Sequence, residues 1–222
     1  MEELQKRILQ DGVVLSSNIL KVNSFINHQV DPLLMDSCGK ALADHFTQYG
    51  PTKVLTAQTS GVAPAQATAF HLGVPYVFAR ESKPITLSGH SVLEARSRSY
   101  TKNKDIVLYA AAEFIQSNDK ILIVDDFLAS GTTAEALHSM CKQAGAEVIG
   151  MGFLVEKNFQ GGRQTIHKDI PEFDMSRVVS LAIVGSLDDK NKRVILSDQD
   201  NLQQSVNSLI PTVKRECHSR NS

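Results

Sequence analysis

The feature that most limits what this chain can fold into is the segment from Ile121 to Thr133, where an apolar run leads into two acids and a small-residue turn. The run Ile121 to Val124 is typical of a central strand that is covered on both faces. Asp125 and Asp126 follow it, and a helix begins after the turn. In open α/β sheets, ligands collect outside the carboxyl ends of the strands, where these two acids emerge. The segment therefore predicts an α/β protein with a ligand site at this point.

The turn from Ala129 to Thr133 has the composition of an anion site. Backbone N–H groups lie at a helix N-terminus, Gly131 lets the backbone approach a ligand closely, and Ser130, Thr132 and Thr133 add hydroxyl donors. Two carboxylates beside a bound phosphate would repel it unless they bind sugar hydroxyls or a hydrated Mg²⁺. A phosphorylated sugar satisfies both requirements.

A plainer interpretation is that Asp125 and Asp126 only cap the turn, as aspartates often do. The apolar strand before them and the Ser-Gly-Thr-Thr sequence after them favour the ligand site instead. Other phosphate and nucleophile motifs are absent from the sequence. There is no G-x-x-x-x-G-K-[ST], Gly150-x-Gly152 lacks a third glycine, and residues 58–62 lack the glycines of a nucleophile elbow.

The rest of the chain alternates between expected strands and helices. Strands are expected at 53–57, 74–79, 106–111, 121–124, 147–155, 177–184 and 193–196, and helices from Asp31 to Gly50 and at 62–72, 132–143 and 201–209. Turns are expected at 58–61, 116–119 and 160–162, and residues 80–104 are expected to form a long mobile loop. The alternation predicts an α/β fold with an open, mostly parallel sheet and helices on both faces.

Composition excludes several classes of partner. Lys+Arg of 23 against Asp+Glu of 24 gives a net charge of -1, so we expect no nucleic-acid partner. No apolar run approaches the roughly 18 residues that a membrane span needs, and the first ten residues lack a signal-peptide core. We therefore expect a soluble cytoplasmic protein without a membrane partner. Cys38, Cys141 and Cys217 lie far apart and predict neither a zinc site nor a redox pair.

The segment from Ile121 to Thr133 resembles the phosphoribosyl diphosphate signature of the type I phosphoribosyltransferases. Four further segments resemble the purine-specific enzymes of this family, and within them the branch that acts on xanthine: 12–34, 73–80, 99–102 and 156–160. The resemblance runs from about Met1 to Asp198. It implies one phosphoribosyltransferase domain over 1–198, with a small base-binding hood formed by about 1–30 and parts of 157–198, and a C-terminal extension over 199–222.

The resemblance also implies an activity. The chain would transfer the 5-phosphoribosyl group from phosphoribosyl diphosphate to xanthine, giving xanthosine 5'-monophosphate and diphosphate, with Mg²⁺ as cofactor and a homodimer as the assembly. Two alternatives remain: a guanine or hypoxanthine phosphoribosyltransferase, and a non-catalytic regulator that senses phosphoribosyl diphosphate. Such regulators usually carry a basic face, and the first thirty residues hold only Lys6, Arg7 and Lys21 as cations.

Site residues follow from the resemblance position by position. It implies catalytic roles for Asp125, Asp126 and Lys102 and xanthine-binding roles for Leu20, Asn27 and Lys157. No side chain is expected to ligate Mg²⁺ directly, because the ion would be held mainly through the substrate. The expected phosphoribosyl diphosphate contacts are Ser60, Gly61, Arg80, Ala129, Ser130, Gly131, Thr132 and Thr133.

Side-chain chemistry supports some of these roles. Lys157 follows an apolar strand, and its ammonium would donate to an exocyclic purine oxygen, which favours 6-oxopurines over adenine. Asn27 offers both a donor and acceptors to a purine edge, although a turn-forming Asn is commoner. Leu20 would pack against the ring or belong to the ordinary core. Ala129 offers no side chain to take the purine proton, so base catalysis stays unassigned. Glu81 stands where a second cation is expected, which leaves Arg80, Lys83 and Lys102 as candidates for the diphosphate.

Overall fold

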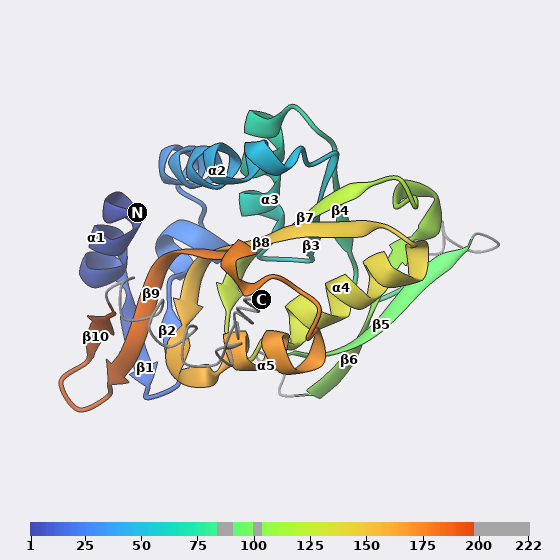
Figure 1. Ribbon diagram of the computed structural model, residues 1–222. Coiled ribbons are helices and arrows are strands. Elements are labelled where there is room, and N and C mark those ends of the chain that lie inside the picture. The colour runs from blue at the N-terminus through green and yellow to red at the C-terminus, as the bar shows by residue number, and fades with distance from the viewer. Residues whose placement is uncertain (84–90, 100–103, 198–222) are drawn as a thin grey trace, which may run out of the picture.

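A six-stranded sheet forms the centre of the computed structural model, which describes residues 1–83, 91–99 and 104–197 (Figure 1). The strand order is β10-β9-β8-β7-β3-β4. All neighbouring pairs are parallel except β9 and β10, which are antiparallel. The expected open, mostly parallel sheet is confirmed. The strands are β3 (Lys53–Ala57), β4 (Tyr76–Ala79), β7 (Lys120–Leu128), β8 (Glu147–Lys157), β9 (Val178–Asp188) and β10 (Arg193–Leu196).

Helices cover both faces of this sheet, as expected (Figure 1). Leu122 and Val124 of β7 pack in one core cluster with α2 and α3, whereas Ile121 and Ile123 pack in a second cluster with α4. Successive side chains of a strand point to opposite faces, so an unbroken apolar run suits a strand with a core on each side. The helices are α1 (Glu2–Asp11), α2 (Pro32–Phe46), α3 (Val62–Leu72), α4 (Thr132–Ala144) and α5 (Gly162–Asp169).

Helix α2 begins where the sequence predicts. The backbone amides of Leu33 and Leu34 donate to Asp31 Oδ1 at 3.2 and 3.3 Å, which makes Asp31 the N-cap. The helix ends at Phe46, and a 3₁₀ turn (Thr47–Tyr49) carries the chain to Gly50. A short π-helix lies at Asn23–Asn27, and further 3₁₀ turns lie at Ala112–Phe114, Asn158–Gln160 and Met175–Arg177.

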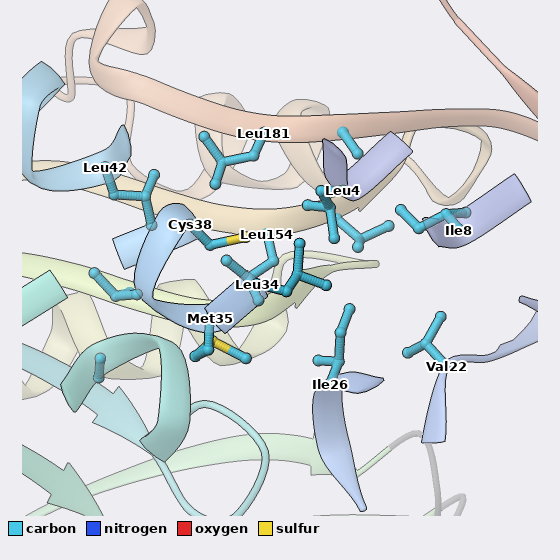
Figure 2. Packing of buried hydrophobic residues seen from close by; sticks show 14 of the residues in the cluster. Leu4, Ile8, Val22, Ile26, Leu34, Met35, Cys38, Leu42, Leu154 and Leu181 are labelled. Atoms are coloured by element: carbon cyan, nitrogen blue, oxygen red, sulfur yellow. The ribbon is translucent and has the colours of Figure 1, made fainter. Parts of the chain in front are cut away.

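The N-terminal segment packs onto the core on the α2 side of the sheet. It contains α1 and the antiparallel pair β1 (Val13–Ser16) and β2 (Ile19–Lys21). Figure 2 shows Leu4 of α1 close to Leu154 of the sheet, with Ile8 farther along the same cluster, which also includes Leu181. The assignment of a hood to about 1–30 and parts of 157–198 stays a prediction. Within the described residues, no helix is long and apolar enough to cross a lipid bilayer.

The expected loop over 80–104 is wrong in part. β5 (Val92–Ser99) pairs antiparallel with β6 (Lys104–Ala111), which also begins earlier than expected. Leu93 and Ala95 are buried while Glu94 and Arg96 between them are exposed, so the segment has the period of a half-buried strand. The charged outer face hid this period in the sequence. Residues 84–90 and 100–103, which include Lys102, lie outside the described residues, as do the expected helix at 201–209 and the extension.

Helix α5 was also missed. The sequence predicts only a turn at 160–162, yet a helix starts at Gly162 directly after it. It has eight residues, of which only Gly162 and Ile166 are buried. One buried side chain in two turns gives no apolar period, so the pattern could not reveal this helix.

Candidate functional site

The candidate site lies where the strand order of the sheet reverses direction. β3 and β7 are neighbours, but the chain leaves β3 toward β4 on one side and leaves β7 toward β8 on the other. Their pairing covers only Lys53–Leu55 against Ile121–Ile123 and then stops. Crevices of this kind, outside the carboxyl ends of parallel strands, are the usual ligand sites of open α/β sheets. The loop after β3 and the acids of β7 both face it.

The acidic pair lies directly against the loop that follows β3. Asp125 and Asp126 are 8% and 7% exposed. A Cβ placed on Gly61 would lie 2.3 Å from Asp125 Oδ1, and the Ser60 side chain hydrogen-bonds to Asp126. Asn27 Nδ2 donates to Asp126 Oδ2 at 3.4 Å. The structure thus brings Ser60, Gly61 and Asn27 together with both acids.

Burial dominates the electrostatics of this pair. It raises the pKa of Asp125 well above its usual value, and the charge of Asp126 raises it further. Burial also raises the pKa of Asp126, which hydrogen bonds from Ser60 and Asn27 partly counteract. Two buried neighbouring carboxylates are costly to ionise together, so hydroxyl donors or a cation at this point would be strongly favoured.

The turn after β7 has the expected strand–turn–helix form. Gly131 has φ of 86°, in the left-handed region that glycine adopts readily, and α4 begins at Thr132. Ser130 Oγ and Thr132 Oγ1 lie 3.1 Å apart. The first N–H groups of a helix have no partner within the helix, and this end carries the positive pole of the helix dipole. The turn therefore presents backbone and hydroxyl donors to an anion, next to the acidic pair.

The end of β8 supplies a half-buried lysine close to the acids. Lys157 Nζ donates to the Asn18 carbonyl at 3.3 Å and lies 5.3 Å from the centroid of the Phe127 ring. Burial lowers the pKa of Lys157, and the charge of Asp126 opposes that shift. Gln160 Nε2 donates to the same Asn18 carbonyl at 3.1 Å. These contacts link the β1–β2 turn to the end of β8.

Two side-chain acceptors, one on a residue bonded to Asp126 and one on a residue that shares the Asn18 carbonyl with Lys157, lack a donor among the described residues. Asn27 Oδ1 and Gln160 Oε1 are buried and have no hydrogen-bond partner among the described residues. Buried polar atoms are normally paired, so each of these two invites a donor from a ligand. Donor and acceptor groups on one side and an anion turn on the other suit a ligand with a polar ring and a phosphate. Gln160, Asn18 and Phe127 were not among the expected site residues, although all three lie in segments that carry the family resemblance.

Two expected site residues, Leu20 and Arg80, make other contacts in the described part of the chain, and a third is not described. Leu20 is 7% exposed and belongs to the N-terminal core. Arg80 pairs its backbone with Tyr109, and its guanidinium lies 5.0 Å from the centroid of the Phe78 ring, beside a cavity of about 640 Å³ along edge strand β4. Lys102 lies outside the described residues.

The sequence did not lead us to expect the buried ion pair that lies beside the site. Glu156 is 1% exposed, and Arg163 Nε lies 2.9 and 3.0 Å from its two carboxylate oxygens. Ser180 Oγ donates to Glu156 Oε2 at 2.7 Å. An acid next to Lys157 looks like the polar end of a strand, and only the arginine seven positions later offered a signal.

Comparison with known proteins gives three results. Residues 29–186 match the model of the phosphoribosyl transferase domain family. A xanthine phosphoribosyltransferase of Lactobacillus delbrueckii subsp. bulgaricus is 52% identical over 162 residues, which cover 73% of this chain and 85% of that protein. One of Streptococcus gordonii is 44% identical over 200 residues, covering 90% of this chain and 100% of that protein.

A likeness to solved structures extends to the fold. An adenine phosphoribosyltransferase from Trypanosoma brucei, solved with AMP, pyrophosphate and ribose-5-phosphate, superposes with a TM-score of 0.65. It is 17% identical and covers 81% of this chain and 79% of its own. At this identity the likeness shows the fold alone.

Proposed function

The chain belongs to the phosphoribosyl transferase domain family, and from this premise we propose that it transfers the 5-phosphoribosyl group of phosphoribosyl diphosphate to xanthine. The products are xanthosine 5'-monophosphate and diphosphate. The observation that carries the proposal is the buried pair Asp125 and Asp126, set directly beside the anion turn 129–133. The purine follows from the relatives named above and from Lys157, whose ammonium suits an exocyclic oxygen.

Each group has a distinct task in this reaction. A purine nitrogen forms the new bond to the anomeric carbon while the bond to diphosphate breaks, diphosphate leaves with the bonding electrons, and the proton of that nitrogen passes to solvent. Asp125 and Asp126 hold the ribose hydroxyls and face the positive charge that develops on the ring. The turn 129–133 holds the 5-phosphate, and Lys157, Asn27 and Gln160 orient the purine. Arg80 and Lys102 are proposed to meet the diphosphate, and Leu20 the purine ring.

Mg²⁺ enters with the diphosphate substrate. The carboxylates of Asp125 and Asp126 are hard oxygen groups of the kind Mg²⁺ prefers, but two do not make a cage, so the ion would be held mainly through oxygens of the substrate and of water. When bound, the ion supplies positive charge that offsets the charge of the leaving diphosphate. We further propose that the protein is cytoplasmic and that it forms a homodimer. Light scattering after size-exclusion chromatography tests the homodimer.

A comparison of purines tests the function. With Mg²⁺ and phosphoribosyl diphosphate present, we expect kcat/KM for xanthine to exceed that for adenine by at least about 10²-fold, because the adenine amino group would face the Lys157 ammonium. Diphosphate release is the measurement. Preference for guanine or hypoxanthine would keep the reaction class and change the substrate. Binding of phosphoribosyl diphosphate without release would point to a sensing regulator.

The anion turn makes a prediction of its own. We expect Gly131→Ala to raise KM for phosphoribosyl diphosphate by about 10-fold or more, because a Cβ would lie 2.7 Å from the Gly162 carbonyl oxygen at a φ of +86°. Steady-state kinetics at saturating xanthine measures the change. Gly145→Ala, at a φ of +73° beyond the far end of α4, is the control: it carries similar backbone strain and should leave this KM unchanged. Unchanged kinetics in Gly131→Ala would argue against phosphate binding at the turn.

A further inference from the structure

We infer that Glu156 and Arg163 form a positioning pair that fixes the separation between the phosphate-binding turn and the purine-binding Lys157. The inference rests on the proposed function and deepens it. Neither residue is assigned a contact with substrate. Their role is to hold two halves of one site, which come from different strands, at the spacing that a nucleotide requires.

The purine side of this link is strand β8. Glu156 and Lys157 are consecutive, so their side chains point to opposite faces of the strand. Arg163 grips both carboxylate oxygens of Glu156, and Ser180 Oγ of the neighbouring strand donates to one of them. Arg163 Nη1 also donates to the Val178 carbonyl at 2.9 Å. The backbone that carries Lys157 is thereby tied to β9 and α5.

The phosphate side is the first residue of α5. A Cβ on Gly162 would lie 2.5 Å from the Ala129 carbonyl oxygen and 2.7 Å from Leu128 Cδ1. Backbone therefore touches backbone between α5 and the anion turn, with no room for a methyl group. Arg163 follows Gly162 directly. A shift of Arg163 relative to Glu156 would therefore also shift the Gly162 backbone that contacts the anion turn.

Stability alone does not explain this pair. Glu156 is 1% exposed, and replacing a buried ion pair by apolar residues of similar size is often neutral or stabilising. A bidentate guanidinium–carboxylate contact fixes both distance and orientation, which an apolar contact does not. Geometry is therefore the property that the pair supplies next to this site.

The test compares a ligand that spans both halves with one that occupies a single half. Xanthosine 5'-monophosphate spans both, whereas ribose 5-phosphate reaches only the turn and the acids. In the double variant Glu156→Leu with Arg163→Met, we expect Kd for the nucleotide to rise about 100-fold, since small misplacements have effects of this size. Kd for ribose 5-phosphate should change less than about threefold, because this ligand occupies one half of the site and does not depend on the spacing between the halves. Arg163→Lys keeps the charge without the fork, and its loss should be intermediate. Isothermal titration calorimetry measures the Kd of each variant for each of the two ligands.

A comparably buried ion pair provides the control. Lys53 Nζ lies 2.7 Å from Asp119 Oδ2, with side chains 14% and 11% exposed, at the opposite end of the sheet. Lys53→Met should lower Tm and leave the ratio of the two Kd values unchanged. The positioning role would be overturned if the double variant raised Kd for both ligands equally, or if it changed Kd for neither. Failure of the unmodified protein to bind the nucleotide would instead overturn the proposed function.

Discussion

Replacing Asp125→Asn together with Asp126→Asn is expected to lower kcat/KM for phosphoribosyl diphosphate by roughly 10²- to 10⁴-fold. Each carboxylate that accepts from a ribose hydroxyl contributes about 1.5–3 kcal/mol as a charged hydrogen-bond partner, and the variant removes two. Asparagine keeps the size of each side chain, so the fold is retained. Initial rates at varied phosphoribosyl diphosphate and saturating xanthine measure the effect, and near-normal kinetics would count against the acidic pair as the sugar site.

The same variant is expected to be more stable at neutral pH. Both carboxyls have a pKa raised above the usual 3.8 in the folded state, so the folded protein binds their protons more tightly than the unfolded chain does. The stability that these groups contribute is therefore fully present below about pH 3.8. It is lost as pH rises through the raised pKa values that the two carboxyls have in the folded state. Asparagine does not ionise and escapes that loss.

Thermal melts between pH 4 and pH 8 measure this difference. Each kcal/mol of relief would raise Tm by about 2–4 °C in a chain of this length. The gap between variant and unmodified protein should widen with pH. A variant that is less stable at neutral pH would mean that the carboxylates support the fold rather than a ligand.

The segment around β7 shows how far sequence reasoning reaches. Four apolar residues, two acids and a small-residue turn lie close together in the chain, so local patterns predicted the strand, the crevice and the helix start. The family resemblance drawn from the same segment is confirmed by the match over residues 29–186. Asp125, Asp126 and the turn 129–133 lie side by side because they are consecutive, and no tertiary contact was needed to expect this.

The remaining features depend on side-chain contacts and strand pairing that local patterns do not reveal. Arg163 meets Glu156 only because α5 folds back under β8, and a short helix with one buried apolar side chain leaves no periodic signal. Gln160 and Lys157 meet through the Asn18 carbonyl, 139 residues from Lys157 in the sequence. Strand β5 is held by pairing with β6 beneath a charged outer face. Each is a tertiary arrangement that local propensity does not encode.

Base selectivity should depend on Lys157. We expect Lys157→Met to lower kcat/KM for xanthine by roughly 10- to 150-fold, the effect of losing a charged hydrogen-bond donor, while KM for phosphoribosyl diphosphate stays within about twofold. Methionine keeps an unbranched chain that can still pack near the Phe127 ring, which limits the change to the lost ammonium. Steady-state rates at varied xanthine, adenine and phosphoribosyl diphosphate measure kcat/KM for each purine and KM for phosphoribosyl diphosphate.

A surface lysine separates this effect from a general change in charge. Lys168 of α5 has a side chain 84% exposed, so Lys168→Met removes the same charge without touching the site and should leave selectivity unchanged. Burial lowers the pKa of Lys157 and the charge of Asp126 raises it, so the amine that we propose for the purine is coupled to one of the acids that we propose for the sugar. If Asp126→Asn removes that support, the amine loses its proton at lower pH, and the upper limit of the pH–rate profile for xanthine should fall. A profile identical to that of the unmodified protein would contradict this coupling and, with it, the assignment of the Lys157 ammonium to the purine oxygen.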